Sequence, residues 1–181
     1  MPSPYRELLG AEWDRLAPSL RDFHDVEKAW EGRAVFRVTR GRGLLRNLVA
    51  WFGGLPPAGE AVPVNLRCTC EQSGGRTVEV WDRDFNGFQM RSIQWAERGK
   101  LVEKFGWISL GYRLRVEPSV LRLEVTNAWF AGIPIPIFLA PTGEGVEKAE
   151  TDGSLSIRAT AFAPLLGQIV CYEGRLEGQK T

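Results

Sequence analysis

The sequence predicts a mainly β protein with N-terminal helices: a curved antiparallel up-and-down sheet of about nine or ten strands that forms a barrel or half-barrel, with helices packed against it. Apolar residues recur at every second position through most of residues 31–177, which is the period of a strand with one buried face. Tight turns such as Asn86-Gly87 and Asp152-Gly153 join these runs, so neighbouring strands should pair antiparallel. A sheet this long must curl or close to bury its apolar face.

Length and composition indicate one ordinary globular domain over residues 1–181. The chain has 44% hydrophobic and 25% charged residues, and its net charge of +1 gives no electrostatic reason to expect a nucleic-acid partner. The N-terminus lacks the basic start and apolar run of a secretory signal, and no apolar stretch approaches the about 20 residues of a transmembrane segment. We therefore expect a cytoplasmic protein.

Two helical regions are expected. Residues 1–25 carry apolar side chains three and four apart after a Ser3-Pro4 start, and Pro18 should divide this segment into a long helix and a short one. A second helix is inserted at residues 44–52, between glycines. Basic residues near its Trp51 and Phe52 fit either a helix packed on the core or one lying at a membrane interface.

The remaining segments are expected to be strands. They cover residues 33–40, 62–71, 77–85, 88–97, 101–105, 108–117, 121–125, 146–151, 154–162 and 170–176. Four tryptophans (Trp81, Trp95, Trp107 and Trp129) fall on these strands, where they either line a cavity or fill the core. The apolar, proline-interrupted segment 129–139 could line a barrel mouth, contact a membrane surface or cap the core.

Few residues suggest enzyme chemistry. The three cysteines are expected to be reduced, and Cys68-x-Cys70 with a single histidine, His24, is too small a set for a metal site. The sequence has no Gly-x-Ser-x-Gly elbow and no phosphate-binding loop. The carboxylate pairs Glu147/Glu150 and Asp82/Asp84 are expected to face solvent. We predict no catalytic residue, metal or cofactor.

Arg83 is the most informative candidate for a binding site. Strand alternation places Trp81, Arg83 and Phe85 on one face. A guanidinium between two aromatic rings could anchor the anionic end of a ligand inside a β-pocket. It could equally form a structural ion pair with an internal carboxylate, for which Glu103 and Glu124 are the candidates.

Several different short motifs are spread along nearly the whole chain. They are Tyr5-Arg6-x-Leu8-Leu9-Gly10, Gly41-x-Gly43, Leu55-Pro56-Pro57-x-Gly59-Glu60, Trp81-x-Arg83-x-Phe85-x-Gly87 with Ser92 after it, Glu103-x-Phe105-Gly106, Gly132-x-Pro134-x-Pro136 and Tyr172-x-Gly174-x-Leu176. In this order they resemble an uncharacterised bacterial family, domain of unknown function 4166. The resemblance adds Ser92 and Tyr172 to Arg83, Trp81 and Phe85 as candidate ligand-binding residues, but it supplies no activity.

These observations predict a non-enzymatic binding module that holds an apolar or amphipathic small molecule, including an anionic one, in a β-pocket. Members of the family also occur behind a nucleotide-binding reductase-like domain. The first alternative is therefore a protein-interaction module that docks on such a partner. An enzyme of unrecognised type is the second alternative. No transmembrane segment is expected, and peripheral membrane contact stays open.

Overall fold

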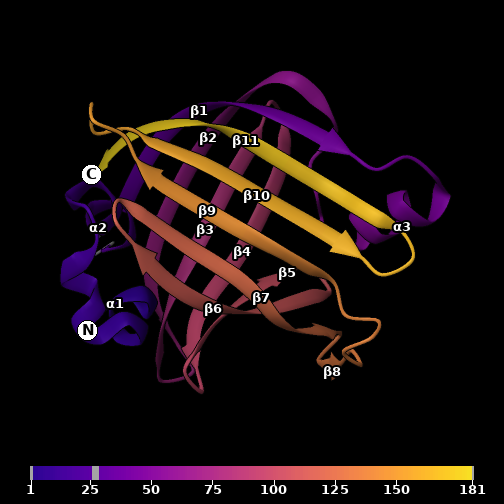
Figure 1. The fold of residues 1–181 in the computed structure, drawn as a ribbon, viewed down its shortest axis with the longest axis horizontal. Coiled ribbons are helices and arrows are strands. Elements are labelled where there is room, and N and C mark those ends of the chain that lie inside the picture. Colours follow the sequence, from indigo (N-terminus) through magenta and orange to yellow (C-terminus); the bar gives the residue numbers. More distant parts are fainter. Residues whose placement is uncertain (1, 26–28, 181) are drawn as a thin grey trace.

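The computed structural model describes residues 2–25 and 29–180 and shows a closed antiparallel barrel (Figure 1). The sheet order is β6-β5-β4-β3-β2-β1-β11-β10-β9-β7, and β6 also pairs with β7, which closes the ring of ten strands. The strands are β1 (Ala29–Arg40), β2 (Gly59–Ser73), β3 (Arg76–Phe85), β4 (Phe88–Glu97), β5 (Lys100–Phe105), β6 (Ile108–Glu117), β7 (Val120–Phe130), β9 (Thr142–Ala149), β10 (Leu155–Ala163) and β11 (Gly167–Lys180). A short outer strand, β8 (Ile133–Pro134), pairs with the end of β7.

This architecture confirms the predicted mainly β fold and chooses the closed barrel over the half-barrel. One predicted position is wrong: Trp107 lies in the turn between β5 and β6 rather than on a strand. The backbone of Gly106 has a φ of +50°, which turns the chain there and leaves the Trp107 side chain 61% exposed.

The N-terminal helices cover one end of the barrel (Figure 1). They are α1 (Pro4–Leu9), the 3-10 helix η1 (Gly10–Arg15) and α2 (Pro18–His24). The predicted long first helix is wrong, because Gly10 adopts a left-handed φ of +50° and ends α1 early. Pro18 begins the last helix, as predicted.

Aromatic side chains anchor these helices inside the barrel. The Phe23 ring contacts Trp30 at 4.7 Å and Trp81 at 5.0 Å between centroids, in edge-on geometry. Trp30 lies over Gly32 and Gly178, which face each other across β1 and β11, and a Cβ atom at either glycine would overlap its ring. The glycines therefore make room for the tryptophan that the N-terminal helices pack on.

Helix α3 (Leu44–Phe52) lies at the opposite end, where it connects β1 to β2 (Figure 1). Its bounds match the predicted helix. Within the helix, Ala50 is fully buried against the barrel. The guanidinium of Arg46 donates a hydrogen bond to the Leu166 carbonyl in the turn between β10 and β11. The Phe52 ring contacts Phe130 at 5.5 Å. Helix α3 is thus attached at two sides of the barrel rim. Among the described residues, no helix has both the length and the apolarity needed to cross a membrane.

Candidate functional site

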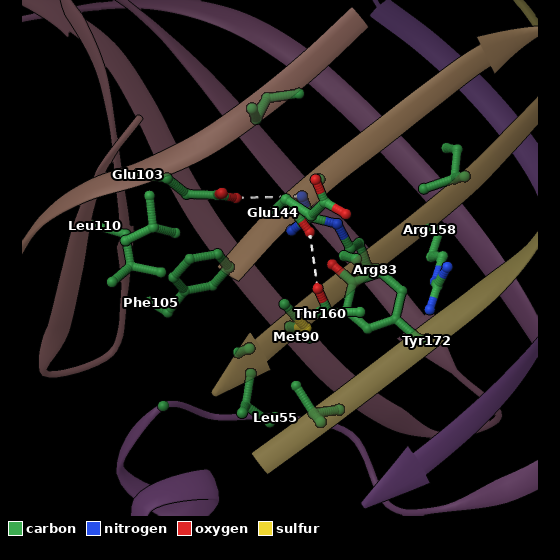
Figure 2. A pocket seen from close by; sticks show the side chains of 18 of the residues that line it. Leu55, Arg83, Met90, Glu103, Phe105, Leu110, Glu144, Arg158, Thr160 and Tyr172 are labelled. Atoms are coloured by element: carbon green, nitrogen blue, oxygen red, sulfur yellow. Dashed lines mark hydrogen bonds and ion pairs between the residues drawn. The ribbon is translucent and has the colours of Figure 1, made fainter. Parts of the chain in front are cut away.

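The barrel encloses a cavity of about 170 Å³. Figure 2 shows its mixed lining, in which apolar side chains such as Met90, Phe105 and Leu110 surround Arg83 and Tyr172. The volume is close to that of cavities that hold one aromatic ring.

The cavity extends toward the α3 end of the barrel. Val49, Gly53 and Leu55, in and after α3, belong to its lining. Strands β7 and β9 pair only as far as Glu124 and Glu144, and the lining includes residues just beyond this last pair. The cavity therefore approaches the surface at the end where α3 and β8 lie.

Arg83 on β3 is held by one side chain from each of the next two strands, β4 and β5. Its guanidinium donates to the Ser92 hydroxyl at 2.8 Å and to Glu103 Oε1 at 3.2 Å, and Ser92 donates to the same carboxylate oxygen at 2.6 Å. The guanidinium carbon lies 4.9 Å from the centre of the Trp81 ring. Arg83 thus forms a buried ion pair and still borders the cavity.

The charges of this cluster balance. Burial alone would lower the pKa of Arg83, but the Glu103 carboxylate and smaller effects together raise it. Burial, followed by Glu103, raises the pKa of the Tyr112 phenol well above its usual value, and burial also raises that of Tyr172. At neutral pH the guanidinium of Arg83 is therefore charged, and the phenols of Tyr112 and Tyr172 beside it are neutral.

A second polar group lies deeper, beneath the N-terminal helices. The Tyr5 hydroxyl donates to Gln94 Oε1 at 2.9 Å, and His24 Nε2 lies 2.5 Å from Glu147 Oε2. The His24 ring stacks on Tyr5 at 3.8 Å. The expectation that Glu147 faces solvent is wrong, because strand alternation on β9 turns it inward to meet His24.

Glu79 is fully buried on β3 beside this group. Trp81 Nε1 donates to its Oε2 at 3.1 Å, and the Cys68 thiol lies 3.9 Å from the same atom. Its Oε1 has no hydrogen-bond partner among the described residues. Burial raises the pKa of Glu79 to about 8, so this side chain carries a proton at neutral pH.

The structure brings the predicted site residues together. Trp81, Arg83, Phe85 and Tyr172 line the cavity, and Ser92 holds Arg83 in place. Of the two proposed carboxylate partners, Glu103 pairs with Arg83, whereas Glu124 pairs with Arg115 at 3.2 Å, away from the interior.

Sequence reasoning missed Glu79, although it shares the inward parity of Trp81 and Arg83 on the same strand. It also missed Gln94, Tyr5 and Tyr112 as interior polar groups. The cysteines Cys68, Cys70 and Cys171 are unpaired, and the part of the chain that the structure describes contains no cluster of three or more metal-ligating side chains.

Fold and site together define a closed antiparallel barrel around a small, mostly apolar cavity that the ion pair of Arg83 and Glu103 borders. The chain belongs to the family described as Domain of unknown function (DUF4166), whose family model matches residues 16–176. No curated protein is detectably similar. Among solved structures, the chain is similar to Rv2717c from M. tuberculosis, with 13% identity, a TM-score of 0.47 and coverage of 91% of this chain and 99% of that one.

Proposed function

We propose that this protein is a non-enzymatic carrier of one compact amphipathic molecule, with an apolar body of about one ring and one polar end. The observation that carries this proposal is a cavity of about 170 Å³ with a mostly apolar lining, in which Arg83 is held in place by Ser92 and Glu103. Apolar walls supply affinity, and a few fixed polar groups orient the ligand.

The charge balance favours a neutral polar end over an anionic one. Arginine has five N–H donors, of which Ser92 and Glu103 accept two in the structure. A carbonyl oxygen could accept from another guanidinium N–H or from the Tyr172 hydroxyl. A carboxylate at the same place would meet the negative charge of Glu103, so the anionic anchor that the sequence suggested is the weaker form of the proposal.

The internal pairing also supports binding rather than catalysis. Arg83 and Glu103 are engaged with each other and with Ser92, so the groups that border the cavity are held in place. Such a cluster orients a ligand without supplying an unpaired nucleophile or base.

The proposal is tested by native mass spectrometry of freshly purified protein and by titration with single-ring probes. Acetophenone should bind more tightly than benzoate, because only benzoate brings a charge toward Glu103. Equal or tighter binding of benzoate would restore the anionic-anchor hypothesis.

A matched pair of variants locates the binding site. Val125 lines the cavity, whereas Val35 is 59% exposed on the outside of β1. Val125→Phe should fill the cavity and weaken acetophenone binding about tenfold or more, and Val35→Phe should not change it. Unchanged affinity in a folded Val125→Phe protein would overturn the proposal.

A further inference from the structure

The exposed apolar side chains of this molecule gather at one end of the barrel. Among the described residues, every exposed large hydrophobic side chain except Val35 lies at or beside the five connections of the α3 end. These connections are β1–β2, β3–β4, β5–β6, β7–β9 and β10–β11. Leu44 is 89% exposed on α3, Ile137 is 87% exposed after β8, and Leu165 is fully exposed between β10 and β11. We call this set of side chains the collar.

The connections that carry the collar have only positive formal charges. These five connections, residues 41–58, 86–87, 106–107, 131–141 and 164–166, contain only two charged residues, Arg42 and Arg46, and both are basic. Arg46 is engaged with carbonyl groups, but Arg42 is exposed beside the apolar face of α3. The connections at the opposite end instead carry both signs of charge, as in Arg98, Glu150 and Asp152.

Helix α3 is apolar on both faces. Ala50 is buried against the barrel and Val49 lines the cavity, while Leu44, Leu45 and Trp51 point outward and are exposed. One side of this helix therefore faces the cavity, and the other faces the surroundings of the protein. Leucine and tryptophan beside arginine are typical of a helix that lies in a membrane interface.

We infer that the collar docks the barrel mouth onto an anionic lipid membrane. The occupant is a lipid surface rather than a peptide, because the exposed groups stand on several separate connections around the rim. A broad fluid surface can contact all of them together. Apolar insertion and attraction of Arg42 to anionic head groups act in the same direction. The inference of membrane docking depends only on the collar and its neighbouring arginine. Transfer of a ligand between bilayer and cavity would in addition depend on the proposed function.

Vesicle co-sedimentation tests the docking without any ligand. The wild-type protein should bind phosphatidylcholine vesicles that contain phosphatidylglycerol and bind pure phosphatidylcholine more weakly. Leu45→Glu/Phe138→Glu should lower the affinity about tenfold or more, because both side chains are exposed and apolar in the collar. Val35→Glu is the matched control and should bind like wild type. Arg42→Gln should weaken binding to the anionic vesicles about fivefold.

Tryptophan emission gives a second readout on the unmodified chain. Trp51 and Trp107 are 72% and 61% exposed, so vesicle binding should shift emission to the blue, and Trp51→Phe/Trp107→Phe should abolish the shift. Absence of vesicle binding, or equal binding of the double glutamate variant, would overturn the inference. So would a dimer that Leu45→Glu/Phe138→Glu dissociates, since the collar would then join two copies. A stable complex with a purified reductase-like protein that the same variant abolishes would assign the collar to a protein partner. Acetophenone titration without vesicles tests the proposed function separately.

Discussion

Replacing Glu79 by glutamine should remove a pH-dependent weakness of the fold. Glu79 is fully buried, and burial raises its pKa from 4.5 to about 8. Between these two values the folded protein keeps a proton that the unfolded chain has released. Folding then takes up a proton, so stability is largest below the unfolded pKa and falls as pH rises toward the folded one.

The magnitude follows from the size of the shift. Each pH unit inside this window lowers the free energy of unfolding by up to about 1.4 kcal/mol. From about pH 5 to about pH 7 the loss is about 2–3 kcal/mol, a large part of the about 5–15 kcal/mol that stabilises a typical domain. A glutamine keeps an acceptor for the Trp81 N–H and never ionises.

Urea unfolding at a series of pH values measures the effect. Glu79→Gln should match wild type near pH 5 and exceed it by about 2–3 kcal/mol near pH 7. Glu71→Gln, at an exposed glutamate of β2, should follow the wild-type curve at every pH. Parallel stability curves for wild type and Glu79→Gln would show that the carboxyl group is ionised inside the barrel and would refute the reasoning.

Arg83→Leu should lower the free energy of unfolding by about 3–5 kcal/mol, because it leaves the buried Glu103 carboxylate without its cation. The double variant Arg83→Leu/Glu103→Leu should recover much of this loss. A loss below about 1 kcal/mol for Arg83→Leu, measured by urea unfolding, would contradict the ion pair. Gly178→Ala should destabilise by about 1–3 kcal/mol, since its Cβ would overlap the Trp30 ring and the Glu31 carbonyl, and thermal melts check this. Reductant and chelator should leave the melting temperature unchanged, because the cysteines are unpaired, and a shift of more than a few degrees with either would argue for a disulfide or a metal.

Period-two patterning was enough to predict the antiparallel strands and the inward direction of Arg83. The same alternation also separates the two carboxylate candidates: Glu103 shares the inward parity of Leu101 and Phe105, whereas Glu124 lies between the inward Leu123 and Val125. Strand alternation, applied to β5 and β7, therefore distinguishes Glu103 from Glu124 as the partner of Arg83.

Barrel closure and the buried His24–Glu147 pair were not available from local patterns. Closure depends on the pairing of the first strand, β1, with the last strand, β11, which no local turn specifies and which follows from the cumulative stagger of all strands. His24 and Glu147 lie 123 positions apart in sequence, and only the way α2 packs into the barrel brings them together. The early end of α1 was not predicted either, because a glycine such as Gly10 can adopt a left-handed φ but does not have to.

The N-terminal helices close one end of the barrel with fully buried side chains, including Tyr5, Leu20 and Phe23. The interior is consequently a dead end. A ligand of the kind proposed would therefore have to enter and leave at the α3 end, where the collar lies. Release there onto a lipid surface would keep the apolar part of the ligand out of water, whereas release into solution would expose it. The residence time of such a ligand would then depend on what contacts the collar as well as on the side chains that line the cavity.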